Sequence, residues 1–325
     1  MSTMSIYATG GAAINIIAPN FSKHHTKKDP NFAEIYTYFI DTSRSNLTPE
    51  IPEDCIYLID NVDGSGKYRP SNIGVITEST QDILHKFKPS DVNIVVHSCS
   101  GGSGSTLGPT LVSELLARGE TVIVVTVGST SSRIETENTI KTLKSYEIIS
   151  QKRGLPVVNF YKENSVETPR GQVDSELQMA VLLLAALFSG DNKELDKADL
   201  KNFVNYQKVT SYSPKLSLLD LFSEEITLGK NQSLVSVATL VDSSTSSETS
   251  IPTEYQAVGF LSPSAKDLVS VRLPIHVCVI AGYFNGVIES LEAKLKSYDE
   301  TRKIAVEKSI AQEHDTEHTD TGIVL

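Results

Sequence analysis

A glycine-rich segment directly after a predicted buried strand constrains the fold of this chain more than any other feature. Glycines allow backbone N–H groups to turn toward an oxyanion, and a helix that begins there adds partial positive charge. The pattern favours a phosphate-binding loop over a plain Gly/Ser turn. The strand is Val92–His97, and the segment consists of Ser100, Gly101, Gly102, Ser103, Gly104 and Ser105.

Two further glycine turns follow other predicted strands. Either turn alone could be an ordinary tight connection. Because loops after parallel strands open at the same edge of a sheet, we expect all three to line one site, with a lysine near the terminal phosphate. The residues are Gly10, Gly11, Ala12 and Asn15 at the first turn, and Gly64, Ser65, Gly66 and Lys67 at the second.

Short β-rich runs alternate with helical segments through the first half of the chain. This alternation is typical of a parallel sheet with crossover helices, so we predict an α/β fold with a Rossmann-like nucleotide-binding domain. The predicted strands are Ser5–Ala8, Tyr36–Ile40, Ile56–Ile59, Val92–His97, Val122–Val127 and Val157–Tyr161.

A buried central helix and a smaller α+β domain are predicted to follow. Apolar residues between Val173 and Phe188 begin at helical spacing and then become continuous, which indicates a helix buried on nearly all sides. Three β-rich runs come next, Leu234–Val241, Glu254–Leu261 and Leu273–Phe284, and an amphipathic helix runs from Gly286 to Gln312. The predicted parts are a nucleotide-binding domain at 1–172, a connecting helix at 173–190, a C-terminal domain at 191–285, and a C-terminal helix with an acidic tail at 286–325.

The composition argues against several classes of protein, including nucleic-acid-binding and membrane proteins. The net charge of −11 argues against a general nucleic-acid-binding surface, because phosphate neutralisation needs clustered Lys and Arg. Three separated cysteines without a CxxC pair, and an N-terminus without a signal-peptide pattern, predict a reducing cytoplasm. The most apolar stretch, Met179–Phe188, is too short to span a bilayer, so no membrane association is expected.

The order of the loops and the run from Ser98 to Pro109 resemble the tubulin superfamily, and in particular its bacteriophage branch. Ser129 and Thr130, with Lys141-Thr142-Leu143, also have counterparts there. The resemblance extends over essentially the whole chain. It implies a GTPase that assembles head to tail with copies of itself into filaments and binds GTP or GDP with Mg²⁺.

The resemblance also implies roles for individual residues. Gly10, Gly11 and Asn15 take the place of the first nucleotide loop, with Asn15 expected to reach the guanine base. Asp41 falls in the second loop, near the ribose or, through water, near magnesium, and the metal ligands are left open. The sequence departs from the family at Ala13, Ser100 and Thr106, where relatives often have glycine, and it has no clear asparagine between Arg170 and Asp174 to select the base.

Two aspartates three residues apart follow the central helix. Asp196 and Asp199 would share one face of a helix, where paired carboxylates can polarise a water. The simpler interpretation is that Asp196 caps the helix N-terminus. In the tubulin superfamily this segment inserts into the nucleotide site of the neighbouring subunit. The resemblance therefore implies that both aspartates activate water there and that a single subunit hydrolyses GTP slowly.

The end of the chain is acidic and then apolar. By itself such an end is often disordered, yet an apolar terminus gains nothing from remaining in water, and the preceding helix carries several cations. The resemblance implies that this tail docks on the adjacent subunit of a filament. The residues assigned to polymer contacts are Asp315, Glu317, Asp320, Ile323, Val324, Leu325, Arg302 and Lys303.

Other functions remain open at this point. A nucleotide-dependent metabolic enzyme could use a similar sheet, although the sequence contains neither GxGxxG nor GxxxxGK[ST] and no evident catalytic His or Tyr-Lys pair. A structural filament could bind nucleotide without hydrolysing it. The resemblance implies a cytoskeleton in the cytoplasm of an infected bacterium that positions phage DNA, and plasmid partition is the related alternative.

Overall fold

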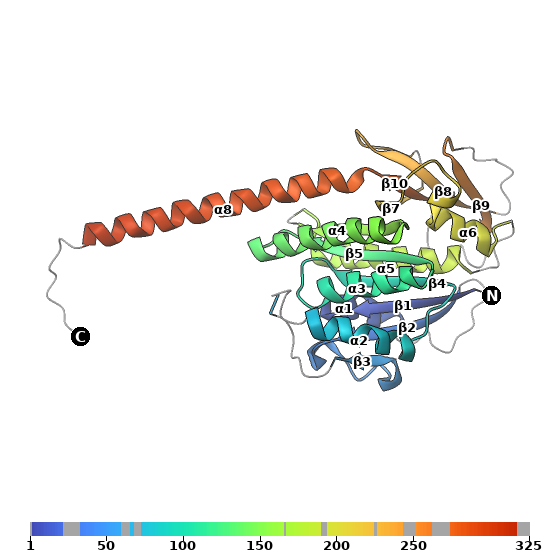
Figure 1. The fold of residues 1–325 in the computed structure, drawn as a ribbon, viewed down its shortest axis with the longest axis horizontal. Coiled ribbons are helices and arrows are strands. Elements are labelled where there is room, and N and C mark those ends of the chain that lie inside the picture. The colour runs from blue at the N-terminus through green and yellow to red at the C-terminus, as the bar shows by residue number, and fades with distance from the viewer. Residues whose placement is uncertain are drawn as a thin grey trace.

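One mixed sheet of ten strands organises the described part of the chain (Figure 1). The strands are β1 Thr3–Thr9, β2 Glu34–Asp41, β3 Ile56–Leu58, β4 Val92–Ser98, β5 Val122–Ser129, β6 Val157–Asn164, β7 Leu216–Phe222, β8 Ser233–Asp242, β9 Tyr255–Leu261 and β10 Ile275–Ala281. The computed structural model describes residues 2–21, 33–59, 66–67, 73–165, 167–189, 194–223, 226–242, 251–261 and 274–316, with side chains of the last helix up to residue 304.

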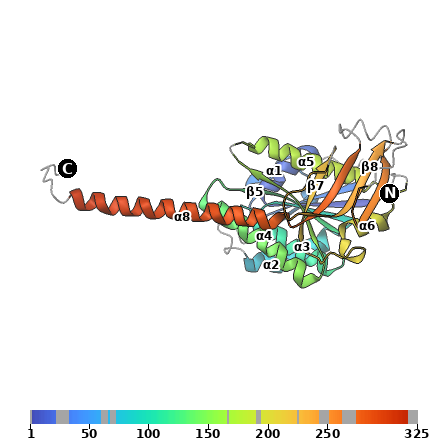
Figure 2. The ribbon, with the colours of Figure 1, turned by 90° about the horizontal axis from the view of Figure 1, so that it is seen from above.

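Helices cover both faces of this sheet. Figure 2 shows α1 and α5 on one face and α2, α3 and α4 on the other. The helices are α1 Gly11–Phe21, α2 Ile73–Lys86, α3 Gly104–Ala117, α4 Arg133–Arg153, α5 Arg170–Leu187, α6 Lys197–Val204 and α8 Tyr283–Thr316, with 3-10 turns at Arg44–Asn46, Glu53–Cys55 and Tyr206–Lys208. None of the described helices is long and apolar enough to cross a membrane.

The strand order is β3-β2-β1-β4-β5-β6-β7-β10-β8-β9. Strands β1 to β6 pair in parallel, as expected for buried strands joined by crossover helices, and β7 adds to β6 in parallel. Strand β10 is antiparallel to both β7 and β8, so the sheet becomes mixed toward its C-terminal edge. The six strands predicted in the first half are confirmed. The four-part division of the chain stays a prediction.

Side chains alternate between two apolar layers along the parallel strands. In β4, Ile94 and Val96 belong to the layer under α1 and α5, whereas Val95 belongs to the layer under α2, α3 and α4. The central helix α5 is buried along most of its length, as its continuous apolar residues indicated. It begins at Arg170, three residues before the predicted start, because Pro169 sets the extended backbone that precedes it.

The second half differs from the prediction in two places. Strand β7 was missed because Leu216–Phe222 is rich in leucine and has no β-branched residue, a composition that does not favour a strand. The strand predicted to reach Phe284 ends at Ala281, since Gly282 has a φ of +85° and ends the pairing. The C-terminal helix α8 therefore begins at Tyr283. It packs against α4 and then extends beyond the body of the molecule (Figure 1).

Candidate nucleotide-binding site

The register of three neighbouring strands brings the predicted loops together. Thr9 of β1 pairs with Ile40 of β2 and His97 of β4, so the residues that follow these three lie at one level of the sheet. The N–H of Gly10 donates a hydrogen bond to the carbonyl of Ile40 at 2.8 Å. The carboxyl edge of the parallel sheet therefore holds the first loop, the loop of Asp41 and the signature loop side by side.

Two helices begin at this edge and approach each other closely. A Cβ atom added to Gly10 would lie 2.9 Å from the backbone nitrogen of Gly104, and one added to Gly104 would lie 2.9 Å from the carbonyl oxygen of Thr9. Gly10 also has a φ of +80°, which glycine adopts without strain. Helices α1 and α3 thus begin next to each other, and their combined partial positive charge favours an anion between them.

Two adjoining cavities open beside these helix ends. The smaller, of 360 Å³, lies between the first loop, Asp41 and the signature loop. The larger, of 970 Å³, extends from the same loops toward the start of α5 and one side of α8. They share five lining residues: Gly11, Ala12, Asn46, Ser98 and Gly101. They therefore form one continuous site, narrow where phosphates would bind and wide enough beyond it for a nucleoside.

Most of the predicted nucleotide residues line this site. Gly66 and Ser105 do not, and Gly64 and Ser65 lie outside the described residues. Ser105 is fully buried, and its hydroxyl donates to the Gly102 carbonyl at 3.0 Å, so it shapes the loop rather than facing the cavity. The lining residues that were predicted are Gly10, Gly11, Ala12, Asn15, Asp41, Lys67, Ser100, Gly101, Gly102, Ser103 and Gly104.

The signature loop is held by side chains from other elements. The hydroxyls of Thr42 and Ser103 lie 2.7 Å apart and connect the second loop to the start of α3. Buried Asn138 of α4 donates to the carbonyls of both Ser100 and Lys67, at 3.1 and 2.9 Å. The loop is therefore fixed in shape before a ligand arrives, which lowers the entropic cost of binding.

Asn46 and Asn138 were missed by sequence reasoning. Asn46 lines both cavities, and its amide contacts the Asp41 carboxylate at 3.4 Å and the Asn15 side chain at 3.5 Å. Asn46 lies five residues beyond the end of β2, in a segment without regular pattern. Asn138 lies within an otherwise ordinary polar helix. Neither position carries a local signal, because both functions arise from contacts across the fold.

Charged side chains line the wide part of the site. Lys67 pairs with Glu135, and Arg170 pairs with Asp174 at 3.4 Å, so two of the cations already have acidic partners. Burial raises the pKa of the Glu135 carboxyl, but hydrogen bonds from Lys67 and Ser129 outweigh it and bring the pKa below its usual value. These pairs keep the wall of the wide cavity close to neutral.

One acidic residue, Asp41, lines the narrow cavity. Its side chain is 4% exposed, and burial raises the pKa of its carboxyl, against the opposing effect of hydrogen bonds from Thr42 and Asn46. No group of three or more His, Cys, Asp or Glu side chains forms a metal-binding cluster among the described residues. The donor set nevertheless fits Mg²⁺, which commonly uses one or two carboxylates together with substrate phosphates and waters.

The two candidate catalytic aspartates lie near the amino ends of the parallel strands, whereas the phosphate loops follow the carboxyl ends. Asp196 caps α6 by accepting from the N–H groups of Ala198 and Asp199, and the Asp199 carboxylate accepts from the Asp196 N–H. The neighbouring Lys197 pairs at 2.8 Å with Asp91, which precedes β4 and also bonds Thr3 at the start of β1. The capping interpretation is therefore correct for the structure of one subunit.

This placement separates the aspartates from the cavity of their own chain. The start of α6 adjoins the amino ends of β1 and β4, whereas the phosphate loops follow the carboxyl ends of the same strands (Figure 1). A strand of seven residues spans about 23 Å. The Asp196/Asp199 pair is consequently too far away to act on a ligand bound in its own subunit.

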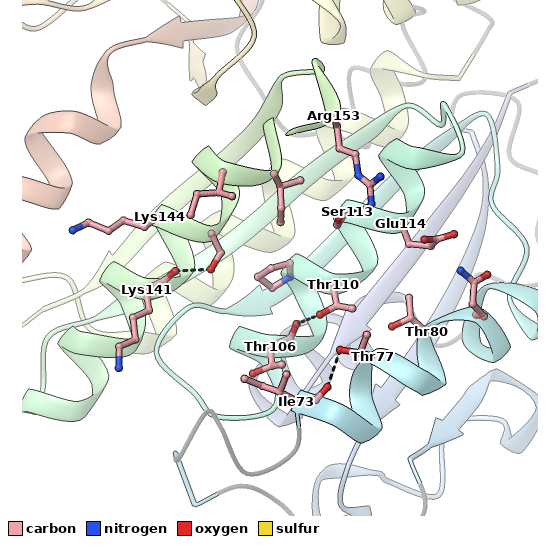
Figure 3. A pocket seen from close by; sticks show the side chains of 15 residues that line it. Ile73, Thr77, Thr80, Thr106, Thr110, Ser113, Glu114, Lys141, Lys144 and Arg153 are labelled. Atoms are coloured by element: carbon pink, nitrogen blue, oxygen red, sulfur yellow. Dashed lines mark hydrogen bonds between the residues drawn. The ribbon is translucent and has the colours of Figure 1, made fainter. Parts of the chain in front are cut away.

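A separate cavity of 720 Å³ lies on the face formed by α2, α3 and α4 (Figure 3). Its apolar lining includes Ile73 and Ile148, which are 46% and 50% exposed. The one acidic lining residue among those described is Glu114, which pairs with Arg118. The basic residues that line this groove are Lys141, Lys144 and Arg153.

The predicted polymer contacts are only partly within the described chain. Arg302 and Lys303 are exposed on α8. Asp315 belongs to the described helix, but its side chain lies outside the description. Glu317, Asp320, Ile323, Val324 and Leu325 lie outside the described residues.

Comparison with known proteins identifies the family. A phage tubulin-like protein of Pseudomonas phage PhiPA3 is 30% identical over 294 residues, which cover 88% of this chain and 91% of the relative. The chain belongs to the phage tubulin-like proteins. A second member, from Pseudomonas phage phiKZ, is 31% identical over 215 residues, 62% of this chain and 63% of that protein. No family model matches.

Solved structures support the same fold for this phage tubulin-like chain. It superposes on the structure described as a protofilament of TubZ from bacteriophage PhiKZ with a TM-score of 0.80 and 26% identity, covering 93% of both chains. A phage tubulin PhuZ bound to GDP gives a TM-score of 0.81 at 17% identity, over 100% of this chain and 96% of that one. The predicted membership of the tubulin superfamily and its α/β fold are confirmed.

Proposed function

We propose that this phage tubulin-like chain binds and hydrolyses GTP and assembles head to tail into filaments. The observation that carries the proposal is the placement of the phosphate loops and the Asp196/Asp199 pair at opposite edges of one sheet. Stacking two copies along the strand direction would bring the aspartates of one copy to the cavity of the next. The similarity to a TubZ protofilament supports this arrangement.

The carboxylates of α6 retain free capacity in their capping role. Asp196 uses Oδ1 for both backbone N–H groups, and no bond to its Oδ2 occurs among the described residues. Asp199 accepts from the Tyr255 hydroxyl at 3.2 Å, which fixes its orientation. A partly exposed, oriented carboxylate pair is suited to hold a water in line with the terminal phosphate of a neighbouring subunit.

The nucleotide would be held mainly by backbone groups. Residues at the starts of α1 and α3 line the narrow cavity, where their N–H groups would bind the β- and γ-phosphates. A Cβ atom added to Gly101 would meet only the Ser98 side chain, at 4.0 Å, so the backbone of Gly101 is open to a phosphate. When bound, Mg²⁺ would supply charge that offsets the phosphates, with Asp41 as the protein carboxylate beside it.

The acidic tail is proposed to bind the groove between α2, α3 and α4 of another copy. The apolar floor at Ile73 and Ile148 suits an apolar chain end, and the basic residues Lys141 and Arg153 suit the preceding acids. Lys141 is exposed and pairs with Glu137 at 2.5 Å on the surface, an ion pair weak enough for a tail carboxylate to replace. Self-assembly would thereby gain a second contact.

The cellular role is proposed from the phage membership of the relatives. A filament that grows and shrinks with GTP could position phage DNA within the cytoplasm of the host bacterium, and plasmid-type partition is the related alternative. No feature of the described site favours a metabolic enzyme.

The function can be tested with purified protein, GTP and a slowly hydrolysed GTP analogue. Light scattering and electron microscopy should show filaments with both nucleotides, and phosphate release should accompany assembly with GTP alone. Filaments without phosphate release would favour a structural polymer. No filaments under any nucleotide would refute the proposal.

A further inference from the structure

The C-terminal helix α8 forms part of the wall of the nucleotide cavity. Lys294 and Tyr298 both line its wide part, although they lie more than 120 residues beyond the start of α5 in the sequence. They are four residues apart and therefore project from the same face of the helix. No local pattern marks these positions for a nucleotide role, because they lie in a segment with the pattern of an ordinary charged amphipathic helix.

Both side chains donate hydrogen bonds to one residue of the loop after β5. The Lys294 ammonium donates to the Thr130 hydroxyl at 2.7 Å, and the Tyr298 hydroxyl donates to the Thr130 carbonyl at 2.6 Å. Thr130 is 5% exposed, and its own hydroxyl donates to Glu163 at 3.3 Å. This loop borders the same cavity through Thr130 itself and Ser131. A buried threonine therefore joins the helix to the cavity wall.

Two ion pairs fix the same stretch of α8 on α4. Lys144 pairs with Glu292 at 2.6 Å, and Arg133 pairs with Asp299 at 2.6 Å. Leu291, 3% exposed, anchors the start of the stretch in the apolar layer. These contacts keep residues 291–299 beside the cavity.

Lys294 differs from the other cations that line the cavity in the described chain. Lys67 and Arg170 have carboxylate partners, whereas Lys294 has a neutral hydroxyl and no carboxylate within 4.0 Å among the described residues. Its charge is therefore available to an anionic ligand. Lys294 lines the wide cavity and not the narrow one, so it lies on the side where the nucleoside and the phosphate attached to it would bind.

We propose that α8 is a nucleotide-sensing element, in which Lys294 and Tyr298 contact the ribose and α-phosphate. Nucleotide binding thereby changes how tightly the helix packs beside the cavity. This inference rests on the proposed binding of guanine nucleotide. From Lys294 to the end of the described helix at Thr316 is about 33 Å. A small change of tilt at the cavity is therefore magnified at the far end, from which the acidic tail continues.

Binding measurements with GDP test the direct contact. Lys294→Ala should weaken GDP binding about tenfold, because a charge-assisted hydrogen bond to a phosphate is lost. Lys296→Ala is the matched control, since Lys296 is exposed on the same helix and does not line the cavity. Lys294→Gln, which keeps the length of the side chain, should behave like Lys294→Ala if charge is what matters. Equal affinities for Lys294→Ala and Lys296→Ala would overturn the proposal.

Hydrogen exchange of the full-length protein tests the coupling between nucleotide binding and the packing of α8. If the two are coupled, each must influence the other by the same free energy. GDP should slow amide exchange within residues 284–300 of the wild type, and this protection should be lost in Lys294→Ala and reduced in Tyr298→Phe at saturating GDP. Unchanged exchange in the wild type would refute the coupling. A wild-type protein that binds no guanine nucleotide would instead refute the proposed function itself.

Discussion

Gly10 and Gly104 pack backbone against backbone, so that a Cβ atom on either would come within 2.9 Å of a main-chain atom of the facing loop. The contact brings the starts of α1 and α3 together beside the narrow cavity. It explains why two glycine turns nearly a hundred residues apart are needed for one site.

Gly104→Ala should destabilise the protein by about 1 to 3 kcal/mol, because the facing backbone has to move. Gly101→Ala is the matched control for stability, since a Cβ there meets nothing closer than 4.0 Å. The control should fold normally and yet bind GDP more weakly, because its methyl group occupies phosphate space. Thermal unfolding and GDP titration separate the two effects. Equal stability of both variants would contradict the packing argument.

Asp41→Asn should alter the pH dependence of stability. Because the pKa of Asp41 is raised in the folded protein, its contribution to stability is complete below the unfolded pKa and is lost as pH rises through the folded pKa. Urea unfolding between pH 4 and 7 should therefore show a smaller loss of stability in the variant than in the wild type. The same variant should need more Mg²⁺ for GTP binding. A steeper loss of stability in the variant would show that Asp41 is not desolvated.

Asp199→Ala should slow GTP turnover in filaments about a hundredfold while leaving GTP binding intact. The variant also loses one side of the capping box, which costs about 1 kcal/mol. Lys201→Ala serves as the control, because Lys201 is exposed on the same helix and takes no part in the capping box. The expected filaments are static under the microscope. Rapid disassembly of Asp199→Ala filaments would exclude Asp199 from catalysis.

Deleting residues 315–325 should raise the critical concentration for assembly about tenfold, because one contact between subunits is lost. The double variant Lys141→Glu, Arg153→Glu should reproduce much of this effect if the tail binds the groove of Figure 3. Lys152→Glu reverses one charge on α4 outside the groove and should have little effect. Sedimentation of filaments over a range of protein concentrations measures the critical concentration of all three variants. An unchanged critical concentration after the deletion would exclude a docking role.

Much of the nucleotide-binding half could be predicted from the sequence. Strand β4 and the following glycines carry a local pattern, and the shared carboxyl edge of a parallel sheet then places the loops together. Features that depend on distant contacts could not be predicted. Asn46, Asn138 and Lys294 acquire their roles only when elements far apart in the chain meet, and β7 lacks the β-branched residues that mark a strand.

GTP turnover per subunit, measured while the protein is diluted through its assembly threshold, tests the central claim most directly. The phosphate loops and the Asp196/Asp199 pair of one chain lie at opposite edges of the sheet, so under the proposed function an isolated subunit would lack the carboxylates that activate water. Turnover per subunit should fall steeply below the threshold while GTP remains bound. A turnover per subunit that stays constant on dilution would contradict hydrolysis across the contact between subunits.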